Sequence, residues 1–294
     1  MTVARPQGQA PGFHRLVLGD FVVTALLDGT VSGVDQKLTG IDRARVEMLL
    51  AEACVPRPTE TSINTFLIHT GSHRVLVDTG AGALMGPRAG RLLSNLRAAG
   101  HAPEDIDTVL LTHIHTDHSG GLSAGGARVF PNAVVRVDRL EADFWLNPAQ
   151  AERAGAEQKK RFQWARDAVG PYQAAGRFEP FEGDTEVLPG IRALAARGHT
   201  PGHCFYAVES QGQKLVIWGD LVHVEAVQLA VPSATVEFDR DPPAAAARRA
   251  KAFAEAASQG YWVAAEHLSF PGIGHLRAQA DGYRWWPLPY SLCE

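Results

Sequence analysis

Within the segment Thr112–Gly121, three histidines and one aspartate crowd into six residues: His113, His115, Asp117 and His118. No other feature constrains the fold as strongly, because clustered histidines repel one another when protonated, whereas a divalent cation binds them as neutral imidazoles. The segment follows a short apolar, β-branched run that predicts a buried strand. At the end of an extended strand His113 and His115 can face one ion, while Asp117 and His118, beyond a tight turn, can face a second. The motif therefore predicts a metal site at the end of a strand.

Three further candidate ligands also come just after the ends of predicted strands. They are His199 after Ile191–Ala195, Asp220 after Lys214–Trp218, and His267 after Tyr261–Ala265. Loops at one edge of a sheet can converge on a single cleft. This shared position is independent of the first motif, and it predicts that all these side chains meet at one site.

Strands alternate with helices along the chain and no linker divides it, so we expect a single domain over residues 1–294. The remaining strand patterns cover His14–Leu18, Phe21–Leu27, Ser62–His69, His73–Asp78, Thr108–Thr112, Ala133–Val137 and Cys204–Glu209. Helical patterns cover Arg43–Ala53 behind a capping Asp42, Arg91–Ala99, Arg139 to about Val169 with a break at Pro148, and Pro242 to about Ser258. Beyond Ala265 we expect Gly- and Pro-rich loops. Strands followed by helices in each half predict an α/β (α+β) fold, with two sheets face to face and helices outside.

Composition and charge argue against several classes of function. The formal net charge is -4 and no long basic run occurs, so we expect no nucleic-acid partner. The three cysteines, Cys54, Cys204 and Cys293, form no C-x-x-C pair and indicate neither a disulfide framework nor a cysteine zinc site. The polar segment 1–13 is expected to be flexible, and no run resembles a signal peptide or a membrane span. We therefore expect a cytoplasmic protein without a membrane partner.

The order His113-x-His115-x-Asp117-His118, then His199, Asp220 and His267, resembles the ligand set of the metallo-β-lactamase superfamily over nearly the whole chain. The resemblance implies the αββα sandwich of that family. It also implies two metal ions per chain, one held by His113, His115 and His199, the other by Asp117, His118 and His267, with Asp220 bridging them. Asp78, in Leu76–Gly80, matches a family position that supports the site rather than binding metal.

The ligand types indicate the metal and its chemistry. Histidine and carboxylate ligands without thiolates suit zinc, with manganese, cobalt and iron as alternatives. The diiron branch of the family usually carries a glutamate at the position of His115, so its absence favours hydrolysis over redox chemistry. Two ions a few ångströms apart can share a water and lower its pKa, which makes a bridging hydroxide available at neutral pH. As a hypothesis, Asp117 orients this hydroxide or accepts its proton.

Other histidines compete for the ligand positions. Family members use the first histidine of a pair such as His199 and His203, so His203 is not expected to bind metal. His275 competes with His267, which is preferred because it directly follows a strand. Four more lie at element ends and are expected to be plain surface residues: His14, His69, His73 and His101.

The segments Glu266–His275 and Gly282–Pro287 are similar to the branch that contains methyl-parathion-hydrolase-like enzymes and quorum-quenching lactonases. This resemblance implies a small-molecule substrate, such as a lactone, an aryl ester or an organophosphate triester, and a homodimer. Trp145 and Phe162 fall where that branch places aromatic pocket walls, although ordinary core packing explains them equally well. Lactonases of the branch often carry a tyrosine three residues after the bridging aspartate. Here that residue is His223, which either donates a hydrogen bond instead or indicates a substrate other than an acyl-lactone.

Other functions compete with the leading hypothesis of a dinuclear metal hydrolase. β-Lactamase activity is one alternative. A glyoxalase-II-like thioesterase is another, but it normally needs a C-terminal helical domain with basic residues, and this chain ends in Pro- and Trp-rich segments. A non-catalytic ligand-binding module has no need of two metals, and a metal content below about one ion per chain would favour it.

Overall fold

The strand patterns of the first half form one mixed sheet in the computed structural model, which describes residues 9–293. The order across this sheet is β1-β2-β4-β5-β6-β9. The first four of these strands pair antiparallel, and β5, β6 and β9 pair parallel. Their bounds are β1 (Phe13–Leu18), β2 (Phe21–Ser32), β4 (Glu60–His69), β5 (Arg74–Val77), β6 (Thr108–Leu110) and β9 (Val134–Arg136).

The second half builds a second sheet in the order β10-β11-β12-β13-β15-β16-β17. Only β13 and β15 pair parallel. The bounds are β10 (Thr185–Leu188), β11 (Ile191–Ala195), β12 (Cys204–Ser210), β13 (Gln213–Ile217), β15 (Trp262–Ala264), β16 (Ile273–Gln279) and β17 (Gly282–Pro287). Two short ribbons pair β3 (Leu38–Thr39) with β14 (Thr235–Val236) and β7 (Ser123–Ala124) with β8 (Ala127–Arg128).

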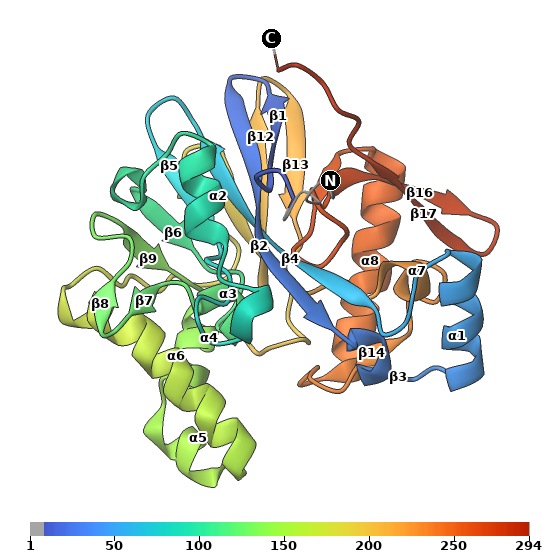
Figure 1. Ribbon diagram of the computed structural model, residues 1–294, viewed down its shortest axis with the longest axis horizontal. Helices are drawn as coiled ribbons and strands as arrows, with labels where there is room; N and C mark the ends of the chain where they lie inside the picture. Colours follow the sequence, from blue (N-terminus) through green and yellow to red (C-terminus); the bar gives the residue numbers. More distant parts are fainter. Residues whose placement is uncertain (1–8, 294) are drawn as a thin grey trace, which may run out of the picture.

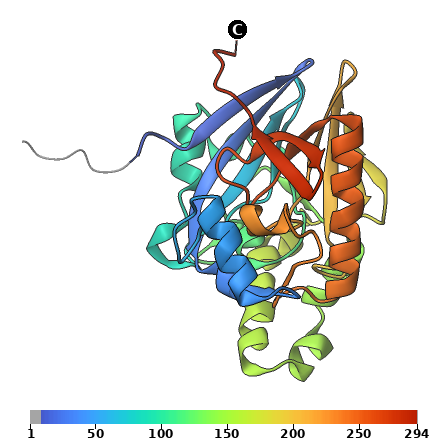
Figure 2. The same cartoon turned by 90° about the vertical axis from the view of Figure 1, so that its right-hand side faces the viewer.

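Separate hydrophobic clusters hold the layers together. Phe66 and Val77 of the first sheet share a buried cluster with Tyr206 and Ile217 of the second, so the two sheets pack face to face. A second cluster joins the first sheet to α2, α4, α5 and α6, and a third joins the second sheet to α8. Figure 1 shows α8 on the right of the sheets and α2, α4 and α6 on the left, and Figure 2 shows α5 and the end of α6 projecting below them. This arrangement confirms the predicted αββα sandwich.

The helices begin and end close to the predicted signals. Asp42 caps α1 by accepting a hydrogen bond from Ala44 N, and Pro242 occupies the first turn of α8. The break expected at Pro148 is the start of α5, capped by Asn147. The bounds are α1 (Arg43–Glu52), α2 (Leu92–Ala98), α3 (Thr116–Ser119), α4 (Arg139–Trp145), α5 (Pro148–Arg153), α6 (Ala156–Ala174), α7 (Glu225–Gln228) and α8 (Pro242–Gln259).

The prediction of loops beyond Ala265 is wrong, because β16 and β17 form an antiparallel hairpin at the edge of the second sheet. Few apolar residues alternate there, so the strand period is weak. Gly274 shows why a glycine lies inside a strand: a Cβ at this position would approach Trp286 O to 2.3 Å. The glycine that suggested a loop instead allows close contact with the neighbouring strand.

The expected flexible segment 1–13 lies mostly outside the described part of the chain, since residues 1–8 are not described. Its last residue is in fact in a strand, because Phe13 begins β1. Gly12 N donates to Asn95 Oδ1 at 2.9 Å, which ties the preceding residue to α2. Across residues 9–293, none of the helices combines the length and the apolar character that crossing a bilayer demands.

Candidate metal centre

The predicted ligands come from both sheets and meet where four strands end. His113, His115, Asp117 and His118 lie in the loop and first turn of α3 that follow β6, in the first sheet. Three strands of the second sheet are each followed by one candidate ligand: His199 follows β11, Asp220 follows β13 and His267 follows β15. The interface between the two sheets therefore ends at a group of seven side chains from four segments that are far apart in the sequence.

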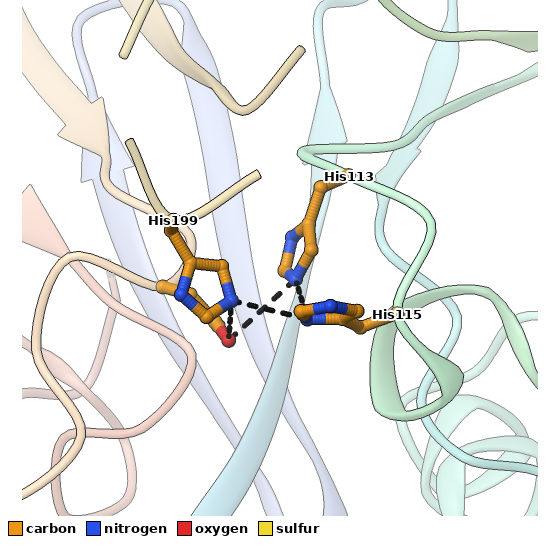
Figure 3. A group of neighbouring side chains, drawn as sticks. His113, His115 and His199 are labelled. Atoms are coloured by element: carbon orange, nitrogen blue, oxygen red, sulfur yellow. Dashed lines mark hydrogen bonds and ion pairs between the residues drawn. The ribbon is translucent and has the colours of Figure 1, made fainter. Parts of the chain in front are cut away.

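His113, His115 and His199 form the first ligand group, and Figure 3 shows their rings pointing toward one another. His115 Nδ1 lies 2.9 Å from His113 Nε2 and 3.0 Å from His199 Nε2. Asp220 Oδ2 lies 3.0 Å from His199 Nε2 and 3.5 Å from His113 Nε2. Three nitrogens and one carboxylate oxygen thus surround one point.

Asp117, His118 and His267 form the second ligand group. Asp117 Oδ2 lies 3.8 Å from His118 Nε2 and 3.4 Å from His267 Nε2. The other oxygen of Asp220, Oδ1, lies 2.9 Å from His118 Nε2 and 3.0 Å from His267 Nε2. Asp220 therefore presents one oxygen to each group, as a bridging carboxylate would.

The separations and the donor atoms fit a pair of divalent metal ions. Ligands of a tetrahedral zinc ion, at bond lengths of about 2.0–2.2 Å, lie about 3.3–3.6 Å apart, and the separations in this site run from 2.9 to 3.8 Å. His118 Nε2 and Asp220 Oδ1 are buried and lie 2.9 Å apart, but neither forms a well-aligned hydrogen bond within residues 9–293. Buried polar atoms without partners are costly, and a metal ion would satisfy both.

Three of the candidate ligand histidines are oriented by an acceptor on Nδ1, the ring nitrogen that faces away from the ligand groups. Asp78 Oδ2 lies 2.7 Å from His118 Nδ1, and Asp239 Oδ1 lies 2.7 Å from His199 Nδ1. His267 Nδ1 lies 2.8 Å from Ser62 O. An acceptor on Nδ1 keeps the proton on that nitrogen and leaves Nε2 free to bind metal. Asp78 thus supports the site, and sequence reasoning missed the same contribution from Asp239.

The ionisable side chains of the two ligand groups shift one another's pKa values. Burial opposes ionisation of Asp220, but the adjacent His118 and His267 bring its pKa well below the ordinary value. Burial also opposes protonation of His199, yet Asp220 and Asp239 raise its pKa to about 9. Burial and the nearby His118 both disfavour the cationic form of His113, so its pKa is lowered well below the ordinary value. Without metal, the carboxylates therefore hold protons on some ligand histidines.

His203 and His275 lie outside both ligand groups. His203 Nδ1 donates to Ala196 O at 2.9 Å, and its Nε2 accepts from the backbone N–H of Asp220 at 3.1 Å. Both ring nitrogens are therefore in use, and His203 positions Asp220. His275 lies on β16, where its ring packs on that of Trp262 with centroids 3.8 Å apart.

A cavity of about 410 Å³ opens onto both ligand groups. His115, Asp117, Asp220 and His267 border it. Its apolar walls are Val31, Val34, Leu84, Met85, Trp164 and Phe238, and two cationic side chains, Lys37 and Arg161, also line it. A mostly apolar cavity with a few polar groups at one end is typical of a site for a small organic molecule.

The expected pocket walls, Trp145 and Phe162, lie in the hydrophobic core and do not line this cavity. They are 4% and 2% exposed, with ring centroids 4.9 Å apart. Trp164, two residues further along α6, faces the cavity instead. Residues two apart on a helix point to different sides, which explains why Trp164 lines the cavity while Phe162 packs in the core.

His223, predicted to take the place of a tyrosine, borders the cavity and contacts the carboxylate of Asp220. Its Nε2 lies 3.1 Å from Asp220 Oδ2, and its ring stacks on that of His267 with centroids 5.3 Å apart. Its Nδ1 is buried without a hydrogen-bond partner in the described chain. With Asp220 and His267 it forms a third group of potential ligands.

Comparisons with known proteins agree with this geometry. The family described as "Metallo-beta-lactamase superfamily" matches residues 58–268. An N-acyl homoserine lactonase of Bacillus thuringiensis is 29% identical over 128 residues, which is 43% of either chain, so the match spans less than half of that relative. Among solved structures, the hydrolase AbOPH of the beta lactamase superfamily has a TM-score of 0.93 at 38% identity, covering 97% of this chain and 100% of its own. AidC, a dizinc quorum-quenching lactonase in complex with a product, has a TM-score of 0.88 at 26% identity, covering 95% and 98%.

Proposed function

Because the chain belongs to the metallo-beta-lactamase superfamily, we propose that it is a dinuclear metal-dependent hydrolase of lactones, with aryl esters and organophosphate triesters as further substrates. The observation that carries this proposal is the position of Asp220, whose two oxygens face the two ligand groups separately. A single-metal site has no use for the second set of ligands. The similarity of the fold to that of AidC, a dizinc lactonase, supports the same interpretation.

Zinc is the metal that the donor set favours, since every candidate ligand is an imidazole nitrogen or a carboxylate oxygen. His113, His115 and His199 would hold one ion, Asp117, His118 and His267 the other, and Asp220 both. A pair of divalent cations supplies an acidified water and polarises the carbonyl or phosphoryl oxygen of the substrate. The protein contributes the arrangement of ligands and the apolar cavity beside them.

Asp117 is suited to proton transfer because its side chain remains 20% exposed at the edge of the cavity. Its carboxylate can orient the attacking water and accept the proton that the water loses. His223 borders the cavity from the other side, and once Asp220 binds metal, the His223 Nε2 that faces Asp220 Oδ2 would be free to donate a hydrogen bond to an oxygen of the substrate. Phe238 and Trp164 offer apolar surface to the rest of the substrate.

Neutral substrates fit this cavity better than highly charged polymers, because apolar side chains make up most of its wall. The test is a panel of acyl-homoserine lactones, aryl esters, paraoxon-type triesters and β-lactams, assayed on zinc-loaded protein. We expect the highest kcat/KM on a lactone, followed by aryl esters and triesters. A β-lactam as the preferred substrate would overturn the substrate assignment, and turnover of none of these classes would overturn hydrolysis.

A matched pair of histidine variants tests the metal centre. His267→Ala removes a proposed ligand, whereas His275→Ala removes the same side chain from β16, outside both ligand groups. We expect two zinc ions per chain and full activity in His275→Ala, with loss of one ion and of activity in His267→Ala. Equal metal contents in the two variants would contradict the assignment of His267.

A further inference from the structure

Glu141, on α4, is a buried carboxylate that belongs to neither ligand group and does not line the cavity. Its side chain is 0% exposed, yet it lies close to the first ligand group. Oε1 accepts hydrogen bonds from Ile114 N at 3.0 Å and from Trp145 Nε1 at 2.7 Å, and Oε2 accepts one from Gly202 N at 2.9 Å. A buried carboxylate is costly unless several donors satisfy it, and here three donors converge on one side chain.

Each donor belongs to a segment that carries or touches a member of the first ligand group. Ile114 lies between His113 and His115, so its N–H fixes the backbone that presents both rings. Gly202 lies three residues after His199 in the same loop. The ring of Trp145 packs edge-on against His115, with centroids 5.3 Å apart. One carboxylate therefore joins a loop of the first sheet to a loop of the second.

Gly202 gives independent evidence that this contact is close. A Cβ added there would lie 2.3 Å from Glu141 N and 2.6 Å from Glu141 Cβ. Any larger residue would push the His199 loop away from α4 and lengthen the bond from Gly202 N. The geometry thus requires a glycine on the loop as well as an acid on the helix.

We propose that Glu141 is a positioning residue that sets the distance between the His113–His115 turn and the His199 loop, and so tunes the metal affinity of the first ligand group. The inference rests on the proposed metal centre. Asp78 and Asp239 orient individual rings, whereas Glu141 acts on two loop backbones and on the indole that packs against His115. The second ligand group receives none of the three hydrogen bonds.

Glu141→Gln is the principal test, because it keeps the size of the side chain. An amide has one acceptor oxygen, and its NH2 would face a backbone N–H. We expect the affinity of the first ligand group for zinc to fall 10–100-fold, as is usual when a partner outside the ligand set is lost, while the second group keeps its affinity. Chelator competition on metal-free protein measures both constants, and the visible spectrum of the cobalt-loaded protein reports the changed ligand arrangement.

Asp138→Ala is the matched control. Asp138 is a buried acid at the start of the same helix, where it caps α4 by accepting from Leu140 N, and within residues 9–293 its side chain forms no hydrogen bond to either ligand loop. It should lower the Tm without changing zinc affinity or the cobalt spectrum. If Asp138→Ala and Glu141→Gln weaken zinc binding equally, the effect is general destabilisation and the proposal is overturned.

Two further variants test the inference even if Glu141→Gln does not fold. Trp145→Phe removes one hydrogen bond and keeps an aromatic ring, and Gly202→Ala places a Cβ against the backbone of Glu141. Both should weaken zinc binding by the first group alone, and the effect of Trp145→Phe should be smaller than that of Glu141→Gln where that variant folds. Wild-type affinity and spectrum in both would overturn the proposal. A wild-type protein that binds no pair of ions would instead overturn the proposed function, so the two failures are distinct.

Discussion

The contact between Asp78 and His118 can be weakened by a single substitution, Asp78→Asn. Asp78 has a left-handed backbone, φ 59°, which asparagine also adopts readily, so Asp78→Asn changes the charge without adding backbone strain. Asp78 Oδ1 accepts from Thr112 N at 2.8 Å, and Oδ2 accepts from Thr112 Oγ1 at 2.8 Å and faces His118 Nδ1 at 2.7 Å. The amide can keep the bond from Thr112 N, and its NH2 then points at the His118 ring.

The consequence for His118 is a change of tautomer. A donor facing Nδ1 moves the ring proton to Nε2, the atom that lies 2.9 Å from Asp220 Oδ1 and would bind metal. Losing a hydrogen bond to a charged group costs about 1.5–3 kcal/mol, which corresponds to about a 10- to 150-fold change in affinity. We expect zinc binding by the second ligand group to weaken about 30-fold, with the first group nearly unchanged.

The assay is competition between metal-free protein and a chromophoric chelator, fitted with two binding constants. Asp239→Asn provides the comparison, since Asp239 supports His199 and should weaken the first ligand group instead. Wild-type constants in Asp78→Asn, or equal weakening of both groups by each variant, would refute the idea that each carboxylate fixes one ligand ring.

Three other outcomes follow from the structure. First, the pKa of His199 in the metal-free protein is raised to about 9, above the ordinary value of about 6.5. The protonated ring therefore contributes its full stabilisation below about pH 6.5, and this contribution is lost as the pH rises through about 9. The Tm of metal-free protein should fall over that range, and zinc should displace protons on binding; a Tm that does not change with pH in thermal scans would contradict this. Second, Trp164→Ala removes a cavity wall and should raise KM by about tenfold with unchanged metal content, whereas a loss of metal in elemental analysis would argue against a purely substrate-binding role. Third, Phe253→Ala, which removes a buried ring stacked on Trp218 at 5.5 Å, should lower the free energy of unfolding by about 3–5 kcal/mol in denaturant titration, and a change below about 1 kcal/mol would mean that the layer under α8 repacks.

The ligands could be predicted because their signals are local. His113 to His118 lie in one short segment, and His199, Asp220 and His267 each follow an apolar strand that the sequence shows plainly. The strand ends fix where these side chains lie, so their convergence follows from the topology. The same reasoning gave the order of layers, since buried strands and amphipathic helices differ in period.

Two supporting residues, Asp239 and Glu141, could not be predicted, because their partners leave no pattern in the sequence. Glu141 binds backbone N–H groups of two distant loops, and any residue except proline supplies such a donor. Trp145 and Phe162 illustrate the related difficulty with cavity walls. Which of the aromatic residues on α4 and α6 faces the cavity depends on the rotation of these helices against the sheet, and composition does not determine that rotation.

The C-terminal hairpin was missed for another physical reason. β16 and β17 lie at the edge of the second sheet, and most of their side chains are partly or fully exposed. An edge strand needs few apolar residues, so its alternation is too weak to distinguish it from a loop. Pairing with β15, rather than local propensity, makes this segment a strand.

The most direct test of the central claim is a crystal structure of the zinc-loaded protein with anomalous scattering measured at the zinc edge. We expect two anomalous peaks, one among His113, His115 and His199 and one among Asp117, His118 and His267, with Asp220 bound to both ions. A single peak, or two peaks with Asp220 bound to neither, would contradict it.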